Sequence, residues 1–350
     1  MKNKKVTLRD IAEETGVTIA SVSMILGGKK ISRFSEGTLE RVRECADRLG
    51  YVSKSSMKPK RKLILIVCPS MFNPYFTTIV QAMEMEAYEN GFDTISFNTY
   101  WDMEREKQVV SVALQNKVDA VIFTMMPQQD EIAIKLNNLL PFAVIGDLKS
   151  DLGVDTINVN NFAAGKLIGQ HYIDMGHKEF AYISSPLNDE HSARTERLRG
   201  LTEVCRNNQI RAPRLFVKDV INPQEELNYT EIEYNVGYEM ATKCIESYKS
   251  VTALVAMNDM IAYGVLDALK AKGYSVPEDY SVSGCDNIFP SKLRGIELTT
   301  IDHHIIQRGK KAIKIIVAKM NNSDTADVVT RVEYSSILID RKTVGRPRNK

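Results

Sequence analysis

The sequence has few cysteines and no long hydrophobic run, and these two absences remove several classes of protein. Its five cysteines lie far apart and form no Cys-x-x-Cys pair, so it predicts neither a disulfide framework nor a zinc site. The most apolar runs, 63–68 and 120–124, are far shorter than the roughly 20 residues that a membrane helix needs. The basic N-terminus is not followed by an apolar stretch, so we expect no signal peptide, no membrane contact and a cytoplasmic location.

Signatures of catalysis are also missing. The sequence contains no phosphate-binding loop, no Gly-x-Ser-x-Gly, no His-Glu-x-x-His and no dinucleotide fingerprint. His303 and His304 are adjacent, and on a helix their side chains would point apart, which argues against a metal pair. We therefore expect a protein that is not an enzyme and that carries neither a metal nor a cofactor.

Charge is distributed unevenly over the 350 residues. The net charge is only +2, but residues 1–62 carry 15 Lys/Arg against 7 Asp/Glu, which leaves the rest of the chain acidic. A basic head on an acidic body is typical of a protein whose head alone meets a polyanion such as DNA. Chain length predicts two or three domains.

Residues 6–50 have the pattern of three short helices. Thr7-Leu8-Arg9-Asp10 predicts a capping box that starts the first helix, and Thr15-Gly16 ends it. Thr18 is positioned to cap a second helix that turns Val22, Ile25 and Leu26 inward. Ser35 caps a third, which ends at Gly50.

This spacing predicts a helix-turn-helix, with Gly16 in the tight turn and the second helix free to enter a major groove. The alternative is an ordinary three-helix bundle. Thr7, Ser21 and Ser23 are natural phosphate ligands at this surface. The free face of the second helix carries Thr18, Ile19, Ala20, Ser21, Ser23 and Met24.

From residue 63 onward, short apolar runs alternate with amphipathic helical stretches. This alternation predicts parallel sheets covered by helices on both faces, and its length predicts two lobes. The expected fold class is α/β, with a helix-turn-helix head and a two-lobed, doubly wound body. The predicted strands are 63–67, 94–97, 120–124, 142–145, 156–159, 180–183, 215–217, 253–256 and 281–284.

Several longer segments of the sequence form recognisable motifs. In the head they are Val6–Glu13, Gly16-Val17-Thr18, Ser21-Val22-Ser23 and Leu49-Gly50-Tyr51. In the body they are Asn158–Asn161, Met175–Lys178, Arg197–Gly200, Asn258–Ala262, Gly273–Asp279, Gly284–Asn287 and Leu298-Thr299-Thr300. With these motifs the sequence closely resembles the lactose-repressor/galactose-repressor (LacI/GalR) family of DNA-binding transcriptional regulators. The resemblance implies a repressor with a body like the periplasmic sugar-binding proteins, whose lobes close on a small-molecule effector.

The resemblance also makes Ile19, Ala20 and Met24 the base-facing positions. Met24 stands where a basic residue is frequent, and apolar groups can touch thymine methyls but cannot fork onto guanine. We therefore predict weak direct readout and heavy reliance on phosphate contacts.

The hinge departs from the family pattern. The Pro-Asn and the Ala-Arg-x-Leu hinge helix that the family has after Tyr51 are absent. Met57 is the only apolar candidate for a minor-groove wedge, and Lys58 in the basic run after it is expected to contact phosphates. The C-terminal Gly345-Arg346-Pro347 resembles a minor-groove hook, although a disordered basic tail is the favoured prediction.

By family position, six side chains are expected to line the effector cleft, with Trp101 as an extra stacking partner. Asn160 stands where the family often has Asp, which changes the donors and acceptors available to a ligand. An alternative for Arg197 and Asp286 is a structural ion pair that joins the lobes. The six are Tyr75, Phe76, Asn160, Arg197, Asp286 and His303.

These inferences divide the chain into a head (1–53), a basic linker (54–62), an effector domain (63–342) and a basic tail (343–350). Within the effector domain we expect lobe 1 to hold about 63–161 and 290–321, and lobe 2 about 162–289 and 322–342. The expected partners are a double-stranded operator, a carbohydrate effector and a second copy in a homodimer, as two half-sites require. The competing classes are an exported solute-binding protein and a sugar-processing enzyme.

Overall fold

The computed structural model describes residues 6–27, 31–51, 61–146, 152–187, 193–219, 231–321 and 328–348. The chain divides into two compact units, Met1–Arg61 and Lys62–Lys350. Within the described residues, no helix is long and apolar enough to cross a membrane.

The first unit consists of three helices around a small apolar core, as predicted. α1 (Leu8–Thr15) begins with the expected capping box, in which the Asp10 carboxylate accepts from the Thr7 backbone N–H at 2.7 Å. α2 (Ile19–Leu26) is capped by Thr18, and α3 (Glu36–Leu49) follows the short 3-10 helix η1 (Ile31–Arg33). The core is closed by Ile11, Val22 and Val42, which are completely buried.

The second unit begins with a lobe built on a six-stranded parallel sheet with the order β11-β5-β4-β3-β1-β2. Side chains alternate across it: Ile64 and Ile66 pack with α4 and α12, whereas Leu65 and Val67 pack with α5 and α6 on the opposite face. The elements of this lobe are β1 (Lys62–Cys68), α4 (Pro74–Glu89), β2 (Phe92–Asn98), α5 (Met103–Gln115), β3 (Ala120–Phe123), α6 (Asp130–Leu139), β4 (Phe142–Val144), β5 (Asp155–Val159), α12 (Ile305–Asn321) and β11 (Arg331–Tyr334).

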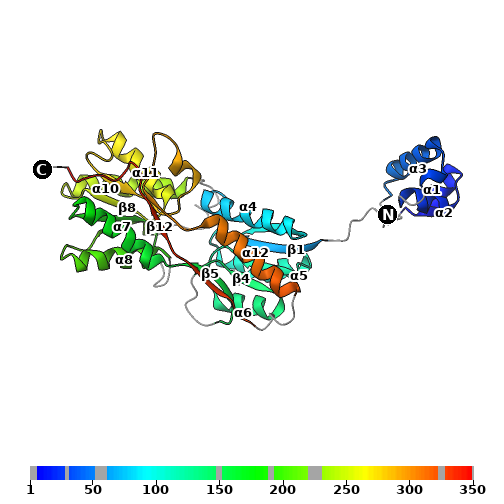
Figure 1. Cartoon of the computed structure of the whole chain (residues 1–350), viewed down its shortest axis with the longest axis horizontal. Helices are drawn as coiled ribbons and strands as arrows, with labels where there is room; N and C mark the ends of the chain where they lie inside the picture. The colour runs from blue at the N-terminus through cyan, green and yellow to red at the C-terminus, as the bar shows by residue number, and fades with distance from the viewer. Residues whose placement is uncertain are drawn as a thin grey trace. The chain divides into compact units, whose positions relative to one another are not determined.

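The second lobe repeats the design on a four-stranded parallel sheet with the order β7-β6-β8-β9. The helices α7 and α8 lie on one side of it, and α10 and α11 lie on the other (Figure 1). The elements are α7 (Asn161–Met175), β6 (Phe180–Ser184), α8 (Ala193–Asn207), β7 (Arg214–Val217), α10 (Ile232–Ser247), β8 (Ala253–Ala256), α11 (Asp259–Ala271), β9 (Ser281–Ser283) and the 3-10 helix η2 (Phe289–Lys292).

All nine predicted strands are present, and the described residues form three more that were not predicted. Two of these, β10 (Thr300–Asp302) and β12 (Ile337–Ile339), pair antiparallel to each other beside the points where the chain crosses between lobes. The chain crosses after β5, between β10 and α12, and between β11 and β12. β11 pairs with β5, so the assignment of the whole of 322–342 to lobe 2 is wrong for this strand.

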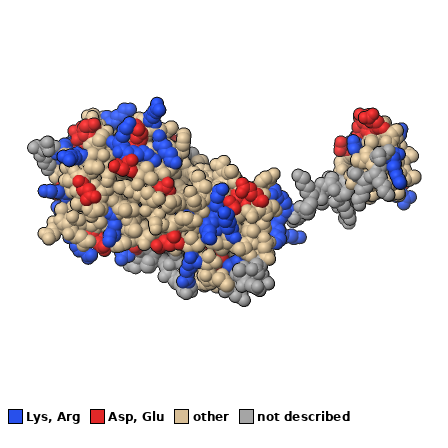
Figure 2. Space-filling view, viewed as in Figure 1, with Lys and Arg blue, Asp and Glu red and all other residues tan. Residues whose placement is uncertain are grey.

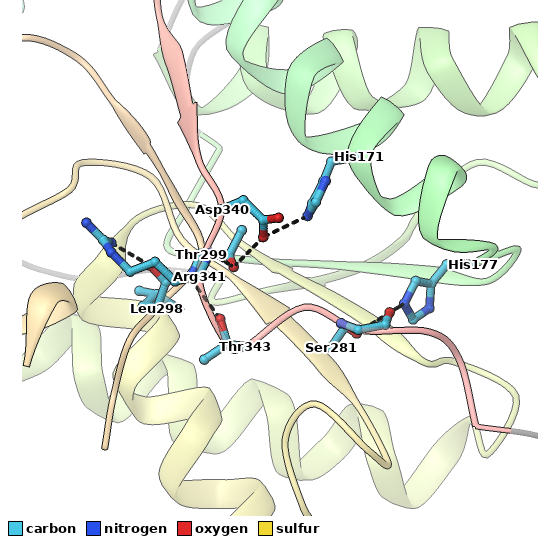
Figure 3. Close-up of polar contacts among 9 residues, drawn as sticks. His171, His177, Ser281, Leu298, Thr299, Asp340, Arg341 and Thr343 are labelled. Carbon is cyan, nitrogen blue, oxygen red and sulfur yellow. Dashed lines mark hydrogen bonds and ion pairs between the residues drawn. The ribbon is translucent and has the colours of Figure 1, made fainter. Parts of the chain in front are cut away.

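The C-terminal segment is a second correction, because residues 343–348 pack on the second lobe. Val344 is buried in the core of that lobe, and the Gly345 N–H donates to Ser281 Oγ at 3.0 Å. The Gly345 carbonyl lies 2.9 Å from His177 Nε2, and Arg348 stacks on the ring of Tyr280. Figure 3 shows the chain leaving β12 past Thr299 and Thr343 toward the Ser281–His177 contact. The described part of the tail is therefore neither disordered nor available as a hook.

Candidate functional site

The exposed face of α2 carries most of the residues predicted to meet DNA. Ile19 is 49% exposed although it begins a helix whose Val22 is completely buried. Thr18, Ala20 and Ser23 are exposed as well. The face is therefore separate from the packed side of the helix.

Two side chains predicted to contact DNA, those of Thr18 and Ser21, form hydrogen bonds within the head. Thr18 Oγ1 accepts from the Ser21 N–H at 3.2 Å and donates to the Ser21 hydroxyl at 2.9 Å. Met24 is half-buried, and Tyr51 packs against the core of the head. Thr7 is exposed and forms the cap of α1, while Met57 and Lys58 lie outside the described residues.

On the first lobe, three aromatic side chains gather at the carboxyl ends of β1 and β2. Asn73 caps α4 by accepting from the Tyr75 N–H at 2.9 Å, which places Tyr75 and Phe76 in the first turn of that helix. The ring centroids of Tyr75 and Phe76 are 5.0 Å apart, and those of Phe76 and Trp101 are 6.5 Å apart, both edge to face. The predicted stacking residues therefore form one aromatic cluster.

Trp101 is held in an unusual backbone conformation. It has a φ of 57° and Tyr100 a φ of 54°, values that non-glycine residues seldom adopt. The Tyr100 N–H donates to the Pro69 carbonyl at 2.7 Å and the Asp102 N–H to the Thr99 carbonyl at 3.0 Å, and both bonds fix this turn. Such strain costs about 1–3 kcal/mol per residue and is concentrated at ligand sites.

The two lobes meet directly at this cluster. The Arg194 guanidinium of α8 lies 5.9 Å from the Trp101 ring centroid. The Asn73 side-chain amide donates to Glu233 of α10 at 2.7 Å, and Asn258 donates to the same carboxylate oxygen at 3.0 Å. We call this region the interlobe site. It comprises the aromatic cluster, Asn73, Glu233, Asn160, Arg197, Asp286 and His303.

On the second lobe, Arg197 and Asp286 are close enough for each charge to shift the pKa of the other. Arg197 donates to the Asn161 side chain at 3.2 Å and to the Met257 carbonyl. Burial by itself lowers the pKa of Arg197, but Cys285, Tyr182, Asp286 and Tyr75 together raise it, so the guanidinium remains charged. Among the described residues no ion pair joins Arg197 to Asp286, and both belong to segments of the same lobe, so the alternative of an ion pair between lobes is wrong.

Asp286 is buried, and burial raises the pKa of its carboxyl well above the usual range. Asp259 adds to that rise in pKa, whereas Arg197 opposes it. Asp259 itself accepts from Ser291, Thr300 and the Ile288 N–H, and so anchors the segment that carries Asp286.

His303 connects the crossover strands to the interlobe site. It is buried, with Nε2 2.9 Å from Cys285 Sγ and Nδ1 3.4 Å from Ser336 Oγ. Burial raises the pKa of the Cys285 thiol to about 12 and lowers the pKa of His303 well below its usual value. Both groups are therefore neutral near pH 7, and the pair is a hydrogen-bonded contact rather than an activated nucleophile.

Asn160 begins α7, and its side chain serves as the helix cap. Its Oδ1 accepts from the Ala163 N–H at 2.8 Å, which leaves the side-chain amide for other contacts. α7 then packs against α8 so closely that a Cβ on Gly165 would lie 2.0 Å from the Arg197 carbonyl oxygen. Gly165 thereby determines where Arg197 stands.

Sequence reasoning did not single out four residues that the fold brings to the interlobe site. Asn73 stands two residues before the predicted stacking residue Tyr75, and Cys285 lies within the Gly284–Asn287 segment of the family resemblance. Glu233 and Arg308 lie in helices where nothing but a charged residue inside an apolar pattern marks them. For Arg308 this position inside an apolar pattern does correspond to a buried side chain, since the residue is only 4% exposed.

Comparisons with known proteins agree with this architecture. Residues 170–344 match the periplasmic binding protein-like domain family. The chain is 27% identical to the HTH-type transcriptional repressor PurR of Mannheimia succiniciproducens over 348 residues, covering 97% of this chain and 99% of the relative. The fold is similar to a LacI-family transcriptional regulator from Silicibacter pomeroyi, with a TM-score of 0.75, 22% identity and coverage of 97% of this chain and 100% of that one.

A second solved structure, a LacI-family regulator from Enterococcus faecium with bound ribose, matches with a TM-score of 0.70 and 23% identity, over 81% of this chain and 99% of that one. The likeness to the PurR relative extends over both the head and the body. The chain belongs to the periplasmic binding protein-like domain family, and nearly its whole length is similar to an HTH-type transcriptional repressor.

Proposed function

We propose that the chain is a cytoplasmic repressor whose α2 reads an operator and whose interlobe site binds a small-molecule effector that controls the reading. The observation that carries the proposal is the two-sided character of α2. Val22 and Ile25 are buried, whereas Ala20 and Ser23, which point away from them, are exposed, and Ile19 at the start of the helix is 49% exposed. The name of the PurR relative supports the repressor role.

The residues for DNA contact are proposed by chemistry. Ile19, Ala20 and Met24 offer apolar surface to thymine methyl groups, since none of them can donate to a base edge. Thr7, Thr18, Ser21 and Ser23 supply hydroxyls to phosphates. Tyr51, Met57 and Lys58 stay predictions from the sequence.

The effector site is proposed at the interlobe site. Tyr75, Phe76 and Trp101 provide an aromatic surface, and Arg197, Asp286 and Asn160 provide polar groups that suit a hydroxyl-rich ligand. The ribose bound to the Enterococcus faecium relative supports a carbohydrate. Ligand binding shifts DNA affinity only if it favours one arrangement of the lobes over another.

A homodimer is proposed because a two-fold symmetric pair of heads matches a near-palindromic operator. The charge on the body supports a role for the head alone in DNA binding. Figure 2 shows acidic and basic side chains interspersed over the visible face of the body, without a large basic field.

Selection of duplexes from a random pool by the full chain tests this function. We expect enrichment of near-palindromic sites, with binding that weakens by about 10³–10⁵ between 50 and 200 mM salt if six to ten phosphates are contacted. Sedimentation of the complex should give two chains per duplex. Failure to enrich any sequence, or a monomer bound to the selected duplex, would contradict the proposal.

A further inference from the structure

Arg308 is a buried cation that forms no ion pair with any residue that the structure describes. It is 4% exposed, and its NH1 donates to the Tyr75 hydroxyl at 3.0 Å. Its NH2 reaches the Ile157 carbonyl only at 3.5 Å, and its Nε has no hydrogen-bond partner. No ion pair to Arg308 or to Arg197 exists among the residues that the structure describes.

The two arginines act on the same place. Arg197 comes from α8 of the second lobe and Arg308 from α12 of the first, and both interact electrostatically with Asp286 and with His303. Neither of these groups neutralises two guanidinium charges: burial keeps the pKa of Asp286 high, and His303 is neutral near pH 7. The other carboxylate of the interlobe site, Glu233, accepts hydrogen bonds from two amides.

Burial of an unpaired charge costs several kcal/mol, and a guanidinium that stays charged in such a place needs an anion. The contrast with Arg214 makes the point. Arg214 is also largely buried, but its guanidinium lies 4.0 Å from the Tyr248 ring centroid and 3.6 Å from a Glu179 oxygen. Arg308 has no such ion pair within the described part of the chain.

We propose that the effector is an acidic sugar, whose carboxylate or phosphate is held by Arg197 and Arg308 from the two lobes while its hydroxyls meet the aromatic and polar groups of the interlobe site. This inference rests on the proposed effector-binding function. The planar, multiply donating guanidinium suits carboxylate and phosphate oxygens better than neutral hydroxyls. Because one arginine stands on each lobe, the anion would also hold the lobes together. Tyr75, which accepts from Arg308, keeps its own proton to donate to the same ligand.

Calorimetric titration of the full chain tests the proposal, with glucose 6-phosphate, glucuronate, glucose and inorganic phosphate as probes at constant ionic strength. We expect at least one acidic sugar to bind about tenfold or more tightly than glucose, the size of a charge-assisted hydrogen bond. The phosphate and carboxylate probes distinguish the two anions. Arg308→Met should abolish the preference for acidic sugars over glucose. Arg308→Lys should retain part of it, because lysine keeps the charge but lacks the paired N–H donors of the guanidinium.

Arg214→Met is the matched control. It removes a guanidinium that has partners, so it should lower the melting temperature but keep the preference for the acidic probe. Arg308→Met without ligand should melt no lower than the parent, because it removes an uncompensated charge. The proposal is overturned if glucose binds as tightly as every acidic probe, if no probe binds, or if Arg308→Met keeps the preference. The titration contains no DNA. A failure of operator binding would therefore contradict the repressor function but would leave the effector measurement unchanged.

Discussion

Ile19 and Met24 test how the head recognises DNA at the scale of single residues. Ile19→Ala with Met24→Ala should weaken preference for the selected operator over a scrambled duplex by about 1–3 kcal/mol, the worth of one good base contact. Binding to the scrambled duplex should hardly change, because the phosphate ligands remain. Fluorescence anisotropy with both duplexes measures the difference.

The control for this prediction is Val22→Ala in the same helix. Val22 is completely buried, so its truncation should lower head stability by roughly 1–3 kcal/mol through the lost burial and the cavity it leaves. Ile19 is 49% exposed, and its truncation should cost far less stability. An unchanged operator preference in the double variant would show that another surface reads the bases.

His177 predicts how stability of the body depends on pH. Burial lowers the pKa of His177 below its usual 6.5, the Gly345 carbonyl partly opposes this, and His171 adds to it. A depressed folded pKa means that the unfolded chain binds the proton first. The contribution of His177 to the free energy of unfolding is therefore complete above pH 6.5. It is lost as pH falls below that value, by up to about 1.4 kcal/mol per pH unit.

Denaturant unfolding of the parent and of His177→Gln between pH 5 and pH 8 measures this slope. The variant should be less stable at pH 8, because Thr252, Ser281 and Gly345 lose a partner, but it should fall less steeply toward pH 5. Parallel curves for the two proteins would exclude His177 as a source of the dependence.

At the scale of elements, the contact between α7 and α8 decides the position of Arg197. Gly165→Ala would place a Cβ 2.0 Å from the Arg197 carbonyl oxygen, so the helices must separate. We expect a loss of stability of a few kcal/mol, in the range of overpacked cores, and weaker effector binding because Arg197 moves. Gly37→Ala is the control, since a Cβ there meets nothing within 4 Å and a helical alanine is favoured over glycine. Unaltered effector affinity in Gly165→Ala would contradict the positioning role.

The elements also separate what the sequence predicts from what it leaves out. Caps and apolar periodicity are local, and α1 and α2 begin at the side-chain caps of Thr7 and Thr18 as predicted. α3 also begins after Ser35, but the Ser35 hydroxyl contacts Thr38 Oγ1 and caps no backbone N–H. β11 has the sequence Arg-Val-Glu-Tyr with no apolar run, so only its pairing with β5 marks it as a strand. Such an edge strand is a product of tertiary structure, which one local window of sequence does not contain.

The same limit applies to the sites. The family resemblance, and not local pattern alone, predicts Tyr75, Phe76, Arg197, Asp286 and His303 at one cleft. The C-terminal segment and Arg308 were beyond that reasoning, because composition describes a basic tail and a charged helical residue but not the surface that buries them.

At the scale of the whole molecule, the division at Arg61 predicts that the two units work separately. Of the four buried clusters that the described residues form, three lie in the body from Lys62 onward, and the head closes its own core with Ile11, Val22 and Val42. Deletion of residues 1–61 should therefore leave a folded body that still binds the effector, with its melting transition preserved by calorimetry. Its affinity for the selected duplex should vanish at every salt concentration, because the hydroxyl and basic groups proposed for phosphate contact go with the head. If the body alone bound the duplex with the same salt dependence, the DNA-binding surface could not be α2. The repressor function would then need a different interface.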